Sequence, residues 1–464
     1  MDDEATNLTA PRGRRRGAVQ TRGAAHMRGA GWLRSMRGDT PGSYRFSDET
    51  PPSMMGAVCA ALSAEVLDRG LLHENRRAWI DYICTFQRDD GWFEDPLLRH
   101  QPGSPHSPEY LRSHQTFLAT MALDALGGLP LRPLCFIENW RDDDAVYEFI
   151  DALPWSDPWA ASNWVEHIGY FLLSDAGLRP ADTPIGPQRR PSGFRGLMAW
   201  LTDHIDPNTG FWGDPPFEEP HRSHYLMAGA FHHYVFFYAT GTAIPAQEHI
   251  IDTTLGLQQP HGLFRPGRPG GGPCDDLDAI DILANMSRLT EHRRGDIHDA
   301  LERASLAILG AQRSDGAFVW AYDPSVWRGF GTRVLPIAHI AGTILNPLSR
   351  RGPRERWWRV REQWRDRLGT HMAYAGESRL RFRTAAGDMY SHWFRPLALA
   401  IAAQTLPVER RPVSWDFGFR DQITQGWWPS DATRHGRFAE SAPRVREPRC
   451  VDRSAHAVCD SPLE

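Results

Sequence analysis

The densest group of side chains that could carry out acid–base chemistry is a run of carboxylates behind a glycine-rich stretch. The glycine stretch ends at Gly272, and Asp275, Asp276, Asp278 and Asp281 follow it. On a helix, Asp275, Asp278 and Asp281 succeed one another at steps of three residues, so neighbours in that row touch, whereas Asp276 is turned away. Like charges this close raise at least one pKa, which would give a proton donor near neutral pH. An acidic start of a helix, favoured by the helix dipole, has the same pattern.

A second group of polar residues lies near the expected starts of several other helices. Serine before a helical run is first of all an N-cap signal, but capping does not explain the histidine or asparagine residues beside these serines. If the helices point the same way, these side chains surround one opening and bind a substrate there. The candidate substrate-binding residues are His114, Asn163, Trp164, His167, His224, Tyr225 and His392.

The elements that must position these residues are indicated by a recurring turn. It occupies residues 86–93, 206–212, 258–264 and 312–318, with a glycine near its centre each time. The last two glycine spacings are nearly equal, and the first is about twice as long. A period of about 50 residues predicts an array of supersecondary units. The glycine fits the end of a helix that needs a positive φ, and the aromatic residue after it can pack back on that helix.

The turn resembles the repeat of the prenyltransferase and squalene-cyclase family, Gln-x-x-x-Gly-x-(Phe/Trp). Gln87, Gly91 and Phe93 match it, as do the equivalent residues at 258–264 and 312–318. The turn at 206–212 lacks the glutamine, and residues 421–428 form a weak further copy. The resemblance implies an all-α fold, an α/α toroid of about six helix pairs. We expect it to span residues 45–428, between a disordered basic tail at 1–44 and a disordered tail at 429–464.

The resemblance also implies a chemistry. Class II terpene cyclases use an Asp-x-Asp-Asp acid whose middle aspartate protonates an alkene or epoxide. Asp276-Leu277-Asp278 matches its first three positions, whereas Ala279 replaces the last aspartate. The implied catalytic residues are therefore Asp278 as the acid, with Asp276 and Asp281 assisting it, in a class II-like isoprenoid cyclase.

Two alternatives stay open, because the same fold hosts unrelated functions. One is a carbohydrate-active toroid of the glycosidase or lyase type, in which paired carboxylates act beside stacked tryptophans. The other is a non-catalytic binding scaffold. In the two enzymatic cases the partner is a small molecule, an isoprenoid or a saccharide.

Composition excludes several other classes. A net charge of −5 gives no general attraction to nucleic acid, and no apolar run approaches the roughly 20 residues of a membrane span. The six cysteines lack paired spacing, which favours a reducing cytoplasm over disulfides or a cysteine zinc site. Asp142, Asp143 and Asp144 do not complete an Asp-Asp-x-x-Asp metal motif, and no phosphate-binding glycine loop or His-Glu-x-x-His motif occurs. We expect no cofactor, no metal and a cytoplasmic protein.

Overall fold

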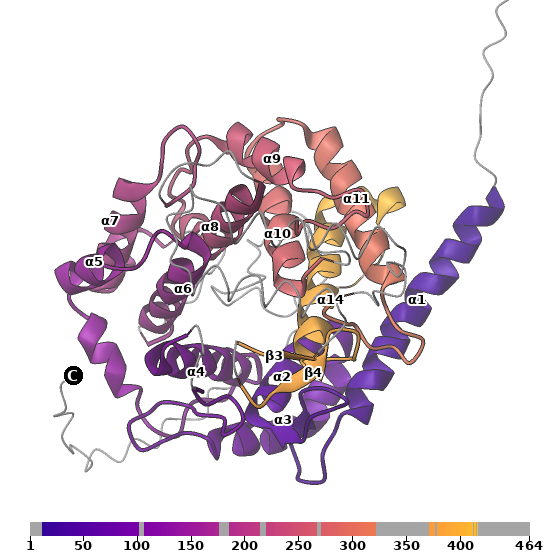
Figure 1. The fold of residues 1–464 in the computed structure, drawn as a ribbon, viewed down its shortest axis with the longest axis horizontal. Helices are drawn as coiled ribbons and strands as arrows, with labels where there is room; N and C mark the ends of the chain where they lie inside the picture. The colour runs from indigo at the N-terminus through magenta and orange to yellow at the C-terminus, as the bar shows by residue number, and fades with distance from the viewer. Residues whose placement is uncertain are drawn as a thin grey trace, which may run out of the picture.

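The computed structural model describes residues 12–101, 106–175, 185–213, 220–266, 271–321, 371–375 and 378–411, together with 413 and 415. This part of the chain is mostly helical (Figure 1). Two short antiparallel sheets, β1–β2 and β3–β4, each have two strands. The prediction that the chain is mainly helical is thus confirmed for the described residues.

The elements follow the order of the chain. The helices are α1 (Arg12–Ser35), α2 (Met54–Leu67), α3 (Arg69–Cys84), α4 (Pro108–Ala125), α5 (Asp143–Asp151), α6 (Pro158–Asp175), α7 (Phe194–His204), α8 (Pro220–Thr240), α9 (Gln247–Gly256), α10 (Pro273–Leu289), α11 (Arg294–Gly310) and α14 (Met389–Thr405). The short 3-10 helices are η1 (Cys135–Trp140), η2 (Pro187–Arg189) and η4 (Val408–Arg410). The strands are β1 (Tyr44–Arg45), β2 (Pro52–Ser53), β3 (His371–Ala373) and β4 (Arg381–Arg383).

Six of these helices form a closed series of contacts. Along the series α2, α4, α6, α8, α10 and α14, each helix packs against the next, and α14 packs against α2 (Figure 1). Every residue of α2 is buried, and so is most of α10 and α14, whereas α3 buries only one stripe. A helix that is apolar all round must be covered on every side, and a helix with one apolar stripe lies at the surface. The sequence therefore sorts its helices into inner and outer ones.

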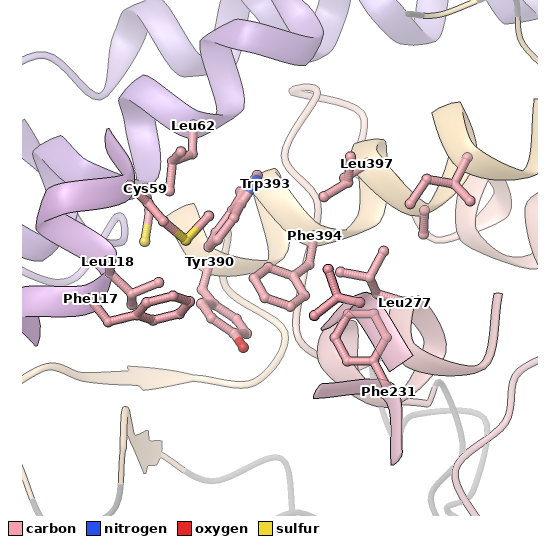
Figure 2. Packing of buried hydrophobic residues seen from close by; sticks show 14 of the residues in the cluster. Cys59, Leu62, Phe117, Leu118, Phe231, Leu277, Tyr390, Trp393, Phe394 and Leu397 are labelled. Atoms are coloured by element: carbon pink, nitrogen blue, oxygen red, sulfur yellow. The ribbon is translucent and has the colours of Figure 1, made fainter. Parts of the chain in front are cut away.

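The core follows the inner helices. Phe117 and Leu118 of α4, Leu277 of α10 and Trp393 and Phe394 of α14 pack in one continuous cluster with Cys59 and Leu62 of α2 (Figure 2). Tyr390 lies in the same cluster, and its ring stacks on Phe394 at 4.2 Å between ring centres. Large aromatic side chains thus meet where four of the inner helices come together.

The four recurring turns have the predicted geometry. Gly91, Gly210, Gly262 and Gly316 all have positive φ, between 75° and 99°. In the three turns that carry the glutamine, its side-chain amide donates to the carbonyl of the turn glycine, at 2.9 to 3.0 Å. The same amide also donates to a backbone carbonyl that lies across the turn, at Arg132, Ala300 or Ala25. The glutamine thus fastens each turn to a neighbouring segment.

Ala25 belongs to α1, so the last of these turns is fastened to the N-terminal helix. A Cβ on Gly316 would lie 2.1 Å from the carbonyl oxygen of Arg28, which shows how closely α1 approaches this turn. Trp32, Leu33 and Met36 are buried. The packed region therefore begins before residue 45, the boundary predicted above, and includes the second half of α1.

Other expectations fall partly or wholly outside the described residues. The tail at 429–464 and the weak turn at 421–428 are not described. Among the described helices, none combines the length and apolarity needed to span a bilayer. Asp143 is the first residue of α5, and the side chain of Asp142 caps the helix.

Candidate functional site

Among the described acidic residues of α10, Asp278 has the fewest polar contacts for its carboxyl group. Its side chain is buried, with 1% of its surface exposed, and neither carboxyl oxygen has a hydrogen-bond partner among the residues that the structure describes. Burial raises the pKa of Asp278 well above its usual value, and the nearby carboxyl groups of Asp275, Glu166, Asp281 and Asp276 raise it further. The surroundings of Asp278 therefore favour its protonated, neutral form.

Asp275, one turn before Asp278, has partners on both sides. His224 of α8 places its Nε2 atom 2.8 Å from Oδ1, and Arg265 places a guanidinium nitrogen 3.1 Å from Oδ2. Gly272 makes room for this carboxylate, because a Cβ there would lie 1.9 Å from Oδ2. His224, predicted as a substrate-binding residue, thus lies next to the acidic cluster and contacts Asp275.

Asp276 connects neighbouring segments of the fold through hydrogen bonds. Its two oxygens accept hydrogen bonds from the backbone N–H groups of Phe264 and Gly272, at 2.8 and 3.2 Å. The second oxygen also accepts from the guanidinium of Arg395 in α14 at 3.0 Å, and both side chains of this ion pair are 1% exposed. Burial raises the pKa of Asp276 to about 6, although the Arg395 charge acts in the opposite direction. Asp276 thus joins α10, the turn before it and α14, and all of its oxygens are occupied.

Asp281 lies farther along α10 and bonds within its own helix. The side-chain amide of Asn285 donates to its Oδ1 atom at 3.1 Å. Burial raises the pKa of Asp281 to about 7, while Asn285 and the charge of Arg288 lower it. Its influence on Asp278 is electrostatic, since it is one of the carboxyl groups that raise the pKa of Asp278.

Serine–histidine pairs link neighbouring inner helices. Ser113 of α4 bonds Nδ1 of His167 in α6 at 3.0 Å, and Ser162 of α6 bonds Nδ1 of His232 in α8 at 2.8 Å. These serines were expected as helix N-caps. The helices actually begin five and four residues earlier, at Pro108 and Pro158, because proline suits the first helical position.

The hydroxyl of Ser162 lies 2.8 Å from both the carbonyl oxygen of Trp159 and Nδ1 of His232. The other ring nitrogen of His232, Nε2, lies 3.7 Å from a carboxyl oxygen of Glu166 in α6, one of the groups that raise the pKa of Asp278. The serine–histidine pairs and the acidic cluster therefore belong to one group of polar side chains.

His114 of α4 completes this group. Its Nε2 atom lies 3.0 Å from the hydroxyl of Tyr374, which follows β3, and its ring centre lies 5.6 Å from that of His167. Nδ1 of His114 and Nε2 of His167 are buried and have no hydrogen-bond partner in the described part of the chain. Burial lowers the pKa of His114 to about 3 and that of His167 well below its usual value, so both rings are neutral.

Three other predicted residues have weaker links to the cluster. Asn163 is half-buried and donates to the carbonyl of Trp159 in its own helix at 2.7 Å. Trp164 is half-buried, and its ring centre lies 5.9 Å from that of Tyr110 and 6.3 Å from that of His167. Tyr225 is half-buried against Trp159, at 5.7 Å. Trp164 adjoins the histidine pair, whereas the side chain of Asn163 is bonded within α6.

His392 has no ring nitrogen left for a substrate. Its Nε2 atom donates to the carbonyl of Gly29 in α1 at 3.0 Å, and its Nδ1 atom accepts from the backbone N–H of Phe318 at 3.3 Å. Trp32 of α1 lies against the ring, at 4.5 Å between centres. The expectation that His392 binds substrate is therefore replaced by a structural role, because both of its polar atoms hold α14 to α1 and to the last turn.

Sequence reasoning missed four members of the cluster: Glu166, His232, Tyr374 and Tyr390. Glu166 lies one residue before His167, and its position on an inner helix was a signal that could have found it. Tyr374 and Tyr390 have strongly raised pKa values because both are buried. Tyr374 meets His114 from 260 positions away, and no sequence pattern predicts that contact. Among the described residues, no group of three or more His, Cys, Asp or Glu side chains is arranged to hold a metal ion.

Comparisons with known proteins add one structural neighbour. No protein-family model matches the chain, and no curated protein matches it. One solved structure, described as a crystal structure of a protein from Actinoplanes, is similar with a TM-score of 0.39 and 17% sequence identity. The similarity covers 64% of this chain and 82% of that chain.

Proposed function

We propose that this chain is an α/α toroid of the prenyltransferase and squalene-cyclase type, and that it is a class II-like isoprenoid cyclase with Asp278 as its acid. The closed series of contacts among α2, α4, α6, α8, α10 and α14 supports the toroid. The three turns fastened by glutamine support the family resemblance.

The observation that carries the chemistry is the state of Asp278. A carboxylic acid kept neutral by burial can protonate a weakly basic carbon only if its proton is not already shared with a better acceptor. Asp278 meets that condition, because its oxygens have no hydrogen-bond partner. The other three aspartates of the cluster are bonded to histidine, arginine, asparagine or backbone groups.

In the proposed reaction, the O–H bond of Asp278 breaks and a C–H bond forms at one carbon of a substrate alkene. The positive charge that appears on the other alkene carbon is attacked by a second double bond, which closes a ring. Loss of a proton from the cyclised cation to water ends the reaction, and the Asp278 carboxylate takes up a proton from water to restore the acid. Phe394 and Phe231 lie near Leu277, the neighbour of Asp278, and Tyr390 stacks on Phe394 (Figure 2). Their ring faces could stabilise the developing cation.

Deuterium incorporation tests the proposal. The purified protein is incubated in D2O with prenyl alcohols and prenyl diphosphates of several lengths, and the products are analysed by mass spectrometry. We expect a cyclic product with one deuterium at the initiating carbon. Asp278→Asn should lower its yield by about 10²- to 10⁴-fold, the usual contribution of a general acid. Asp281→Asn should lower it less, because Asp281 acts only through its charge.

Two results would contradict the proposal. One is a product without deuterium, and the other is a yield that Asp278→Asn leaves unchanged while the variant stays folded. If polysaccharides are cleaved instead, with loss of activity on changing Glu166 or Asp278, the carbohydrate-active alternative takes its place.

A further inference from the structure

The strongest unused feature of the cluster is a pair of imidazole nitrogens that bond to nothing. Nδ1 of His114 and Nε2 of His167 are both enclosed, and neither has a partner among the described residues. Buried polar atoms in folded proteins are nearly always paired, so an unpaired one needs an explanation. Two of them on adjacent inner helices, with ring centres 5.6 Å apart, point to a shared ligand.

The other nitrogen of each ring is fixed, which orients the free one. Ser113 holds Nδ1 of His167, and the hydroxyl of Tyr374 holds Nε2 of His114. Whichever tautomer each ring adopts, its free nitrogen is either one donor or one acceptor. A hydroxyl group, which both donates and accepts, complements a mixed pair, and a carbonyl oxygen complements two donors.

The surroundings are flat and aromatic. The ring of Tyr110 is nearly parallel to that of His114, at 9° and 5.8 Å, and it lies 5.8 Å from His167. Phe117 lies 4.8 Å from His167, and Trp164 closes another side. These walls suit a hydrocarbon chain or ring that carries one polar atom.

The charge of this region disfavours an anionic group. Both imidazoles are neutral because burial lowers their pKa values, and the carboxyl group of Glu166 acts on the neighbouring Tyr110. A diphosphate is recognised by charged donors such as Arg and Lys, whose hydrogen bonds are stronger than those of neutral groups. Arg265 and Arg395 already lie against Asp275 and Asp276, and the charge of Arg288 acts on Asp281.

From this geometry we propose that His114 and His167 bind a neutral oxygen of the substrate, a hydroxyl or a carbonyl. The substrate would then be an oxygenated isoprenoid, and neither a diphosphate nor a plain hydrocarbon. This inference rests on the proposed function, since it specifies the substrate class of the same site. Both nitrogens are sealed from solvent, so entry of the ligand requires the neighbouring side chains to move.

A binding experiment with three probes of equal chain length tests the inference without turnover. Farnesol, farnesyl diphosphate and farnesene are titrated into the full-length Asp278→Asn variant, and calorimetry or tryptophan fluorescence gives the dissociation constants. We expect farnesol to bind at least tenfold more tightly than either of the others. In the Asp278→Asn background, His167→Phe should remove the preference for farnesol over farnesene.

Conservative variants separate binding from structure. The amide of Gln can place a polar atom where Nε2 of His167 lies, and the amide of Asn can do so for Nδ1 of His114. His167→Gln and His114→Asn should therefore keep part of the preference that His167→Phe and His114→Phe lose. His233→Phe is the matched control, because His233 is a buried histidine of α8 whose ring packs on Trp212 and is outside the proposed pair. Circular dichroism confirms that each variant is folded.

The outcomes distinguish the two proposals. Tighter binding of farnesyl diphosphate, or a preference for farnesol that survives both phenylalanine variants, would overturn the oxygenated-substrate inference and leave the cyclase proposal standing. If none of the three probes binds to the folded protein, the isoprenoid function fails, and this inference fails with it.

Discussion

The sharpest prediction contrasts two aspartates that are two residues apart on α10. Asp276 accepts three hydrogen bonds and neutralises the buried guanidinium of Arg395. Asp276→Asn would remove the carboxylate charge that pairs with Arg395, of which 1% is exposed. Removing one partner of a buried ion pair destabilises a protein by about 3–5 kcal/mol. Because a folded domain is stable by only about 5–15 kcal/mol, this loss is a large share of the total.

Asp278→Asn should behave in the opposite way. It removes no hydrogen bond, since both carboxyl oxygens are unpaired, and it keeps nearly the same volume. The folded-state pKa of Asp278 is raised above its unfolded value of about 3.9. Between these two pKa values the folded state holds more protons than the unfolded state, so the contribution of Asp278 to stability falls as pH rises through that window. Asparagine does not titrate, so the variant should gain stability relative to the parent protein as pH rises from about 4.

The assay is denaturant unfolding followed by circular dichroism, at pH 5 and at pH 8, for the parent protein and both variants. Asp276→Asn should shift the midpoint strongly downward at pH 8. At pH 5, the free energy of unfolding of Asp278→Asn should lie within about 1 kcal/mol of that of the parent protein. At pH 8, the difference between the two proteins should have moved in favour of the variant. Equal destabilisation by the two changes would refute the assignment of separate roles. So would a relative loss for Asp278→Asn as pH rises.

Two further predictions concern the way α1 joins the fold. Gly316→Ala should destabilise the protein by more than about 1 kcal/mol, because φ is +99° and the new Cβ would lie 2.1 Å from the carbonyl oxygen of Arg28. Gly310→Ala is the control, because its Cβ would have nothing within 4 Å, and it should be neutral or stabilising. Thermal melting of both variants measures the difference. Trp32→Ala should lower the free energy of unfolding by about 3–5 kcal/mol, as expected for a buried aromatic residue. Arg34→Ala, which removes an ion pair between Arg34 and Asp68 near the surface, should change it by no more than about 1 kcal/mol. An unchanged unfolding midpoint for Trp32→Ala would mean that α1 does not belong to the core.

The turns could be predicted from the sequence because their determinants are local. Gly91 and Gly316 need positive φ, and Gln87 and Gln312 reach a carbonyl four residues on, so the motif contains most of its own geometry. The packing of α1 could not be predicted in the same way. Its sequence is rich in arginine, glycine and alanine, and Trp32, Leu33 and Met36 form too short a set for a helical period to stand out.

The four aspartates of the acidic cluster can be seen in the sequence, but their contacts depend on distant partners. Asp276 is bonded to Arg395, which is 119 positions away, and Asp275 is paired with His224 of another helix. Asp278 is exceptional only because no such partner reaches it. A motif gives the identity and spacing of its residues, whereas the pKa of each residue is set by neighbours that the fold supplies.

The repeat also explains why polar residues recur on the inner helices. In three turns, the backbone N–H of the aromatic residue after the glycine donates to an inner-helix side chain, and the acceptors are Thr116, Asp276 and His392. A threonine, an aspartate and a histidine thus satisfy the same backbone group, so the position requires an acceptor and not a particular chemistry. Polar residues that meet this requirement need no substrate to account for them. The inner helices also carry His114, His167 and Asp278, whose side chains have polar atoms that form no hydrogen bond with a turn of the repeat. Because of this difference, we expect these three residues to bind or protonate a substrate.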